Sequence, residues 1–308
     1  MVAKPTNIAI GFLLLLRLFS PEQHADAQIP LSVAVSILPQ KYFVEKIGGD
    51  RVRATVMVPP GANPATYEPR PSQLVAISKS KTYFAIGVPF ERVWLEKFTR
   101  INPKIQVVRT ERGIEKRAMD TYDDLFVDWI PPWMRKSGLR KSEKEMFMDP
   151  HIWVSPPFAM IIARNILMAL SYFDGEHRDE YKENFEKFQQ EIITLDREIR
   201  NILSGIGKKN RFMVFHPAWG YFADAYGLRQ IPVEIEGKEP KPARLQAIIQ
   251  YAKRLGIKKI FAQPQFSAKS LRMIARVIGA EVSFADPLAI EWAKNLKELA
   301  LEIRPALR

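Results

Sequence analysis

The chain has no cysteine among its 308 residues. That absence excludes disulfide bridges, thiolate metal ligands and a lipid attached through a cysteine at a mature N-terminus. Histidine is scarce as well, with four in the whole chain, so any imidazole site must use very few positions. A phosphate-binding P-loop of the Gly-x-x-x-x-Gly-Lys-Ser/Thr type is also missing, because Gly207-Lys208 is followed by Lys209. The sequence therefore carries no phosphate-loop signature of an ATPase.

Apolar runs of membrane-spanning length are missing too. The run from Ile8 to Leu16 has nine residues, about half of the roughly 20 that a spanning helix needs. Lys4 precedes it, and the small-residue segment 25–27 follows it, which is the arrangement of a secretory signal peptide. We predict that residues 1–27 are a cleaved leader and that the mature chain diffuses freely in the periplasm.

Basic residues exceed acidic ones by 46 to 34, a formal net charge of +12. A basic surface is one feature of nucleic-acid-binding proteins. The chain shows no Arg/Lys run with interleaved aromatic residues, and an exported protein meets little nucleic acid. We therefore expect a scattered, solvated charge and no nucleic-acid partner.

Two blocks of the sequence alternate short β-branched runs with helical patterns, which predicts α/β units on mostly parallel sheets. With 47% hydrophobic residues, the chain is long enough to bury two cores. We predict two Rossmann-like lobes, at 28–174 and 207–308, and a linking helix at 175–206. The expected strands are Leu31–Leu38, Val52–Val58, Thr82–Ile86 and Ile105–Val108, then Phe212–Phe215, Ile231–Ile235, Ile260–Ala262 and Glu281–Phe284.

The linking segment is the most periodic part of the chain. Apolar residues recur at alternating intervals of four and three between Tyr181 and Ile202, which places one apolar stripe along a helix. A helix over Arg178–Leu203 would be about 39 Å long at 1.5 Å per residue. It is long enough to run along both lobes, and we expect it to pack on them in a monomer.

Residues 111–148 show no clear period and combine an acidic half with Pro131-Pro132 and a basic stretch. We interpret this segment as a long surface excursion. A solvated insertion is one interpretation, and weak cation binding by the acidic half is the other.

Two side chains follow strands of the second block. His216 comes directly after the run ending at Phe215, and Asp286 follows the run ending at Phe284. Ligands of open α/β sheets bind at the carboxyl ends of the strands. The pattern therefore predicts an imidazole and a carboxylate at one edge of the second lobe.

His151 lies in Asp149-Pro150-His151-Ile152-Trp153, just before a helical pattern. Alone, such a histidine is more often a cap or a packed residue. The remaining histidines, His24 in the leader and His177 in a charged run, point to no site. His151, His216 and Asp286 together suit zinc, provided that three elements bring them to one place.

The chain resembles the cluster A-I metal-binding proteins of zinc and manganese ABC importers. It shares this resemblance with a family of cell-adhesion proteins. The resemblance covers nearly the whole mature chain and is most specific in four motifs. In order, these are Asp149-Pro150-His151-Ile152-Trp153, His216-Pro217-Ala218-Trp219, Glu236-Gly237-Lys238-Glu239-Pro240 and Asp286-Pro287-Leu288.

The resemblance implies two α/β lobes, one rigid long helix and a metal held in the cleft between the lobes. It implies that His151, His216 and Asp286 are ligands, that the ion is transported, and that the partners are an ABC permease and its ATPase. Manganese-type members tend to have glutamate in place of His216, so zinc is expected, with manganese or iron as alternatives.

The sequence departs from the family at Ala65. The family motif Pro-His-x-Tyr-Glu-Pro reads Pro64-Ala65-Thr66-Tyr67-Glu68-Pro69 here, so the first ligand is missing. Water, Glu68, Glu239 or nothing would fill that place.

Two other functions stay open at this stage. Three protein ligands and an open position also describe a catalytic zinc site, although no H-E-x-x-H helix supplies a base. A member that has lost tight metal binding and recognises another solute is the second alternative.

Overall fold

The computed structural model describes residue 1 and residues 29–120, 148–207, 210–234, 240, 242–266 and 269–307. The predicted leader, most of the 111–148 excursion, and the stretch from Glu236 to Glu239 lie outside the described residues.

The first lobe is a parallel four-stranded sheet in the order β2-β1-β3-β4. Helices cover it, so its central strands are apolar on both faces: Val33, Ala34 and Val35 are all fully buried. The strands are β1 (Leu31–Val35), β2 (Val52–Val56), β3 (Thr82–Ala85) and β4 (Gln106–Arg109), and the connecting helices are α1 (Leu38–Gly48), α2 (Pro71–Lys79) and α3 (Pro89–Ile101).

The second lobe repeats this topology, with four parallel strands in the order β6-β5-β7-β8. A helix follows each strand, as the sequence predicts. The strands are β5 (Arg211–Val214), β6 (Arg229–Pro232), β7 (Lys259–Ala262) and β8 (Glu281–Phe284), and the helices are α8 (Gly220–Ala225), α9 (Pro242–Leu255), α10 (Lys269–Ile278) and α11 (Trp292–Ala306). Two α/β lobes with mostly parallel sheets are therefore confirmed.

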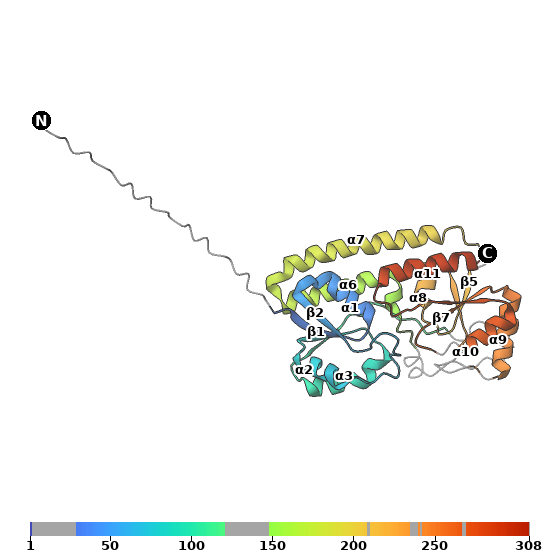
Figure 1. Cartoon of the computed structure of the whole chain (residues 1–308), viewed down its shortest axis with the longest axis horizontal. Coiled ribbons are helices and arrows are strands. Elements are labelled where there is room, and N and C mark those ends of the chain that lie inside the picture. Colours follow the sequence, from blue (N-terminus) through green and yellow to red (C-terminus); the bar gives the residue numbers. More distant parts are fainter. Residues whose placement is uncertain are drawn as a thin grey trace.

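One long helix, α7 (Arg178–Ile202), runs along both lobes (Figure 1). Its apolar stripe packs on α1 and on α6 (Pro156–Phe173) in the first lobe, and on α11 from the end of the chain. Residues Tyr181, Phe188, Ile192, Leu195 and Ile199 are buried, which confirms the predicted stripe. The short η4 (Gly175–His177) precedes α7.

Among the described residues, α6 alone is long and apolar enough to cross a membrane by length and composition. The sequence reasoning had seen no such segment after the leader. Seven of its residues are buried, including Ile162, Ile166 and Leu170, and it packs on α7 and α1. The helix thus belongs to the core of the first lobe.

Several predicted strands end too late. Leu31–Leu38 was expected as one strand, but β1 stops at Val35 and α1 begins at Leu38, because Pro39 at the second helical position favours a helix start. The predicted runs to Val58 and Ile235 likewise outlast β2 and β6. The apolar residues after each strand are still buried, which is why a pattern of hydrophobicity does not show where the pairing ends.

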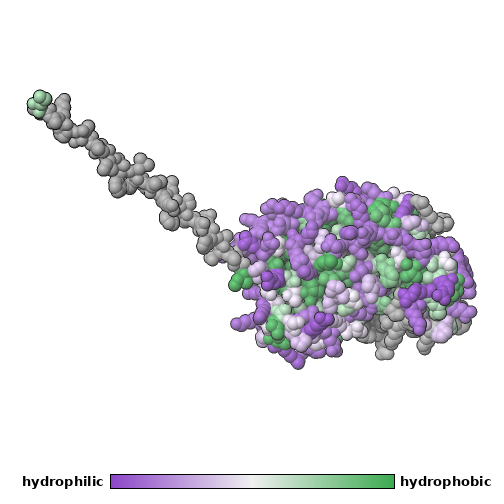
Figure 2. Space-filling model, viewed as in Figure 1, coloured by the Kyte–Doolittle hydropathy of each residue, from purple (hydrophilic) through white to green (hydrophobic). Residues whose placement is uncertain are grey.

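The exterior agrees with a solvated protein. In the face shown in Figure 2 the surface is mainly hydrophilic, with apolar patches scattered between hydrophilic residues. The core beneath is continuous from one lobe to the other, since one buried cluster contains Val33 of the first sheet, Ile192 of α7 and Trp292 of α11. The lobes therefore share a core along α7.

Candidate metal centre

A cleft lies between the lobes, lined by segments that follow strands on both sides. From the first lobe come the segments after β2 (63–65) and β3 (87–89), and from the second the segments after β5, β7 and β8. The strand order reverses between β1 and β3 in the first sheet and between β5 and β7 in the second. Ligands of open α/β sheets bind at such switch points, and both of these open toward the cleft. The topology thus brings two ligand-binding edges together.

His216 enters the cleft from the second switch point, two residues after β5. A reciprocal pair of hydrogen bonds holds its backbone: its N–H donates to Oε1 of Gln263 at 3.0 Å, and Nε2 of Gln263 donates to its carbonyl at 2.8 Å. The imidazole stacks on Phe266, with ring centroids 4.8 Å apart. Both the position and the plane of the ring are therefore restrained.

His151 comes from the first lobe, immediately before the short η3 (Ile152–Val154) that leads into α6. It is 8% exposed, and Asp149 beside it is fully buried. Burial lowers the pKa of His151 below that of a free imidazole, so the ring is neutral at pH 7. A neutral ring is the form that ligates metal.

Each imidazole is bound on its Nδ1 side by a buried carboxylate. Nδ1 of His151 contacts Oδ1 of Asp149 at 2.7 Å, and Nδ1 of His216 contacts Oε1 of Glu234 at 2.7 Å. A carboxylate accepts a hydrogen bond, so in the neutral form of each ring Nδ1 carries the proton and Nε2 carries a lone pair. This is the carboxylate–histidine arrangement that orients metal ligands.

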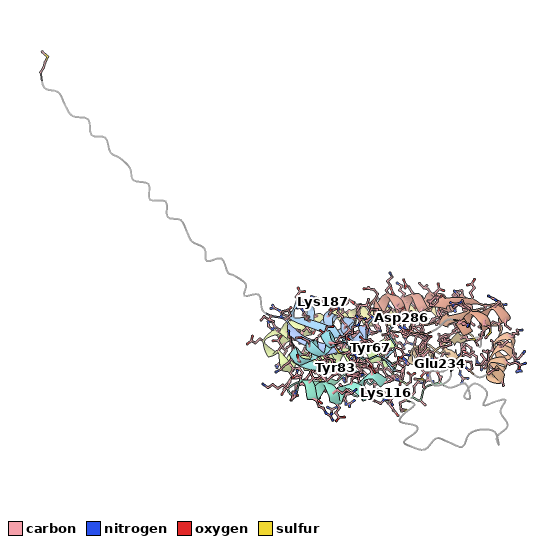
Figure 3. The ribbon with its side chains drawn as sticks, turned by 60° about the horizontal axis from the view of Figure 1, so that its bottom comes forward. Tyr67, Tyr83, Lys116, Lys187, Glu234 and Asp286 are labelled. Carbon is pink, nitrogen blue, oxygen red and sulfur yellow. The ribbon has the colours of Figure 1, made fainter. Side chains whose placement is uncertain are left out.

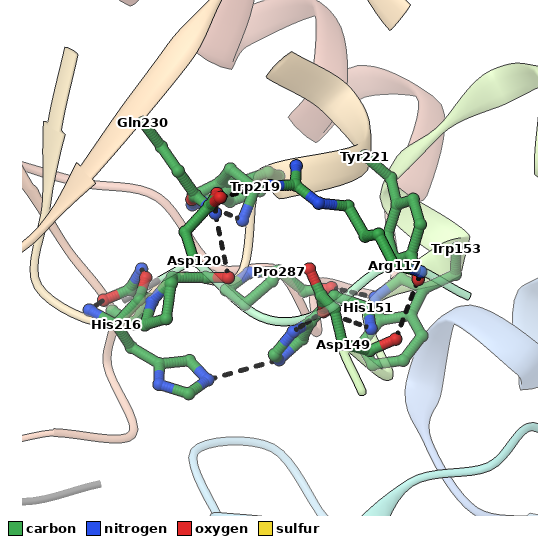
Figure 4. A network of polar contacts seen from close by, with 12 residues as sticks. Arg117, Asp120, Asp149, His151, Trp153, His216, Trp219, Tyr221, Gln230 and Pro287 are labelled. Carbon is green, nitrogen blue, oxygen red and sulfur yellow. Dashed lines mark hydrogen bonds and ion pairs between the residues drawn. The ribbon is translucent and has the colours of Figure 1, made fainter. Parts of the chain in front are cut away.

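The two Nε2 atoms face each other across the cleft at 3.3 Å (Figure 4). Two lone pairs at this distance repel each other unless a positive charge lies between them. In a tetrahedral site with zinc–nitrogen distances of about 2.0 to 2.1 Å, two ligand nitrogens are roughly 3.3 Å apart. The separation therefore suits one ion held jointly by the two lobes.

Asp286 lies at the same end of the second sheet, in the loop after β8. Its Oδ1 accepts hydrogen bonds from Nε2 of Gln265 at 2.6 Å and from the N–H of Leu288 at 2.9 Å, which leaves Oδ2 for another partner. Among the described residues, however, no three His, Cys, Asp or Glu side chains form a group that could hold a metal. The structure brings His151 and His216 together, and Asp286 as the third ligand stays a prediction.

Ala65 lines the cleft in a turn after β2. Its N–H donates to Oδ1 of Asn63 at 2.8 Å, which fixes the turn. The side chain is exposed in the cleft, whereas Glu68 is not among the described residues that line it. Glu239, the other carboxylate considered for this place, lies outside the described residues.

Two indole rings connect the metal-site segments of the two lobes. Nε1 of Trp153 donates to the carbonyl of Pro287 at 2.7 Å, and Nε1 of Trp292 donates to the carbonyl of Trp153 at 2.7 Å. Both indoles are buried. They tie the residue after Asp286 to the segment that carries His151, so neither can move far alone.

A second bridge between the lobes is polar. Tyr221 of α8 donates its hydroxyl hydrogen to the carbonyl of Asp149 at 3.0 Å, and its oxygen accepts the N–H of Arg117 at 3.0 Å. The Arg117 guanidinium also binds Asp224 of α8 at 2.9 Å. The described start of the 111–148 excursion thus contacts the second lobe beside His151 (Figure 4).

A buried carboxyl supports the first-lobe wall of the cleft. Glu91 of α3 accepts hydrogen bonds from the N–H groups of Ile86 and Gly87, each at 2.8 Å, and from the hydroxyl of Ser36. Burial raises its pKa to about 7. Tyr83 hydrogen-bonds the same Ser36 at 2.7 Å, so the network holds the loop after β3 in place.

Sequence reasoning missed the residues that orient the imidazoles. Asp149 begins the motif that contains His151, but only the structure shows that its carboxylate contacts the His151 ring. Glu234 is buried at 3% exposure just after β6, inside a run that was interpreted as strand. A lone acidic residue in an apolar run was the available signal.

Two parallel sheets that oppose their carboxyl edges across a cleft, with one oriented imidazole from each side, define a two-lobed binding protein whose site lies between the lobes. The chain belongs to the family described as "Zinc-uptake complex component A periplasmic", whose model matches residues 33–302. The resemblance noted in the motifs is therefore confirmed.

The similar proteins agree with this assignment. A crystal structure of ZnuA is 39% identical, covers 91% of this chain and 100% of that one, and superposes with a TM-score of 0.80. The high-affinity zinc uptake protein ZnuA of Bacillus subtilis is 24% identical over 84% of this chain and 78% of its own length. The zinc-binding protein AdcA of Streptococcus pyogenes is 24% identical over 88% of this chain, which spans about half (53%) of AdcA.

Proposed function

We propose that this protein captures a divalent metal ion, zinc first of all, between its lobes and carries it to a membrane permease of an ABC importer. The observation that supports the proposal is the 3.3 Å separation of two Nε2 atoms, each opposite an Nδ1 that faces a buried carboxylate. Nitrogen ligands favour zinc over the harder ions that prefer oxygen. A related structure, a ZnuA deletion mutant 39% identical to this chain, has zinc bound.

In this proposal His151 and His216 are the first two ligands, and Oδ2 of Asp286 becomes the third when this side chain turns toward the ion. Water or a non-protein donor takes the place next to Ala65. Transport breaks no covalent bond, so we propose no catalytic residue. Glu68, the base that a zinc hydrolase would need, does not line the cleft.

The proposal extends to the setting of the protein. A leader at residues 1–27 would export the chain to the periplasm, and the absence of cysteine supports a freely diffusing protein over a lipoprotein. The chain would work as a monomer that docks on the permease, with ATP hydrolysis supplied by a separate subunit.

Equilibrium dialysis of the chain from Gln28 onward tests the proposal. Zinc, manganese and iron are offered separately, and the metal retained is counted by mass spectrometry. We expect one zinc per chain, and a thermal stabilisation of about 2.7 kcal/mol when free zinc is a hundredfold above its Kd. Identical melting curves with and without each metal would overturn the proposal.

Paired variants locate the site. His216→Ala should abolish binding, whereas His177→Ala should retain it, because the His177 ring pairs with Asp174 beside η4, away from the residues that line the cleft. Equal losses in both variants would show that the site lies elsewhere.

A further inference from the structure

The cleft is much larger than a metal ion needs. Its volume is about 730 Å³, within the range of roughly 300 to 1,000 Å³ that is typical of pockets for small organic molecules. Much of its lining is apolar, including Val88, Pro89, Met119, Met148, Phe266 and Leu288. A bare ion with its water molecules would leave most of this surface without a partner.

Two cationic side chains also line the cleft. Arg92 lies on α3, and Lys116 lies in the described start of the 111–148 excursion. Within the described part of the chain, neither forms an ion pair with a carboxylate. Figure 3 shows Lys116 and Glu234 at the junction of the lobes.

Gly87 allows Lys116 to occupy this position. Its φ is +85°, a conformation that favours glycine. A Cβ at residue 87 would lie 2.1 Å from the Lys116 ammonium nitrogen, so a side chain there would collide with it. Glycine at position 87 therefore leaves room for the Lys116 ammonium group, which a larger residue there would displace.

Positive side chains are unfavourable neighbours for a bare dication, because like charges repel. Asp149 and Glu234 are turned toward the imidazoles, and Asp286 toward Gln265. Glu111 lies beside Lys116 at Gly87, but its Oε1 is bound to Arg109 at 3.3 Å. A metal that arrives with an anionic organic partner would make Arg92 and Lys116 favourable, and that partner would also contact the apolar walls.

We propose that the cargo is a divalent metal already chelated by a small carboxylate-bearing organic anion. The donors of the chelator take the position next to Ala65 and the place that Asp286 fills for a bare ion. The chelator's carboxylates lie against Arg92 and Lys116, and the two Nε2 atoms complete the coordination. This inference rests on the proposed function, since it assumes that His151 and His216 bind the metal.

Two simple chelators serve as probes. Nitrilotriacetate binds a metal through one nitrogen and three carboxylates and leaves two positions for imidazoles, and citrate is a carboxylate chelator of similar size without a nitrogen donor. The chain from Gln28 onward is dialysed against zinc alone and against the 1:1 zinc complex of each probe. Zinc and chelator are then both counted in the protein compartment by mass spectrometry.

We expect zinc and at least one chelator to be retained together, one of each per chain. Retention of zinc without either chelator would overturn this inference and leave the proposed function intact. Retention of neither zinc alone nor any complex would instead contradict the proposed function. A chelator retained without zinc would also overturn the inference, since the metal would then have no part in binding.

Charge variants test the role of the two cations. Arg92→Ala and Lys116→Ala should each lower the affinity for the zinc–chelator complex, relative to zinc alone, by about tenfold, as expected for one charge-assisted hydrogen bond. Lys104→Ala removes an exposed cation at the opposite edge of the first sheet and should leave that ratio unchanged. An equal ratio in all variants would exclude contact with the cations.

Discussion

At the scale of single residues, the two carboxylate–imidazole pairs determine what the cleft can bind. Asp149 and Glu234 fix the tautomer of His151 and His216. The direction of each Nε2 lone pair is therefore set before any ion arrives. The site is therefore preorganised for nitrogen ligation, and the cost of orienting the two rings is met during folding.

Ala65 offers the most direct test of the incomplete coordination. Ala65→His should tighten the binding of zinc alone by about tenfold or more, because an imidazole would replace water as a ligand. The side chain at this position already lines the cleft. Competition against a fluorescent zinc chelator measures the gain.

Thr66→His is the matched control, since Thr66 belongs to the same turn but is not among the residues that line the cleft. Only the Ala65 variant should gain affinity, and the gain should vanish when His216 is also replaced. The larger side chain should also reduce the space for a chelator. An unchanged zinc affinity would mean that position 65 does not face the ion.

Glu91 predicts how stability depends on pH. Its pKa is raised to about 7 in the folded state, from an ordinary value of 4.5, so the folded state holds the proton more tightly than the unfolded chain. The contribution of this carboxyl to the free energy of unfolding is fully present below pH 4.5 and is lost as the pH rises to about 7. The loss is on the order of 3 kcal/mol.

Urea unfolding of the metal-free protein between pH 5 and 8 measures this slope, and Glu91→Gln should flatten it. The variant also loses one acceptor for the N–H of Ile86 or Gly87, so its stability at pH 5 should be lower. A slope that is equal in both proteins would show that Glu91 titrates normally.

The residues of the site were predictable to different degrees. His216 could be placed from sequence, because a polar residue after a buried strand falls at a sheet edge whatever the details of packing. His151 could be placed only through the family motif, since a histidine before a helix has many roles. The partners Asp149 and Glu234 could not be assigned, because a contact between a side chain and a ring depends on rotamers that no spacing encodes.

At the scale of elements, the site depends on how loops are tied to helices. The hydrogen bond from Trp292 of α11 to the carbonyl of Trp153 joins the last helix to the segment that follows His151. The Trp292 ring also packs on Phe43, with centroids 5.0 Å apart. The position of His151 is thus linked to α11.

Trp292→Phe should separate these two roles. The aromatic packing is largely kept, but the buried carbonyl of Trp153 loses its donor, which costs about 1 to 3 kcal/mol of folding stability. Because the same change loosens the segment carrying His151, we also expect faster zinc release in stopped-flow experiments with a chelator.

Trp94→Phe is the control, since Trp94 lies on α3 against Phe90 and Phe98 and does not line the cleft. It should lower stability without changing the rate of zinc release. If both variants release zinc at the rate of the unmodified protein, the hydrogen bond from the Trp292 indole has no part in holding the site.

Element boundaries show where sequence reasoning reaches its limit. The helix predicted over Arg178–Leu203 differs from α7 by one residue, since a period repeated over seven turns averages out local exceptions, whereas the wider linking segment 175–206 extends beyond both ends of α7. Serine is a favoured capping residue, but α2 begins at Pro71, one residue before Ser72. Proline at a first helical position needs no N–H partner, and this preference prevailed over the capping tendency of serine.

At the scale of the whole molecule, α7 limits how the lobes move. The helix packs on α1 and α6 on one side and on α11 on the other, and no break interrupts its 25 residues. We therefore expect small-angle X-ray scattering to give the same maximum dimension with and without zinc, with changes confined to side chains that line the cleft.

Chelator-treated and zinc-loaded samples at equal concentration make the comparison. A hinge-bending protein would contract on loading, so a clear decrease in the radius of gyration would contradict a rigid connection. The long helix was predicted from sequence, but its contact with α11 was not, because that contact joins segments about a hundred residues apart.

The packing of Trp292 also has a consequence for synthesis. This residue, near the end of the chain, contacts Tyr42, Phe43 and Phe188 in the core around α1 and α7. Domains usually fold in order as they emerge from the ribosome, but here the first core lacks one of its largest side chains until almost the entire chain has been made. We therefore expect this core to reach its final packing only after α11 has been synthesised.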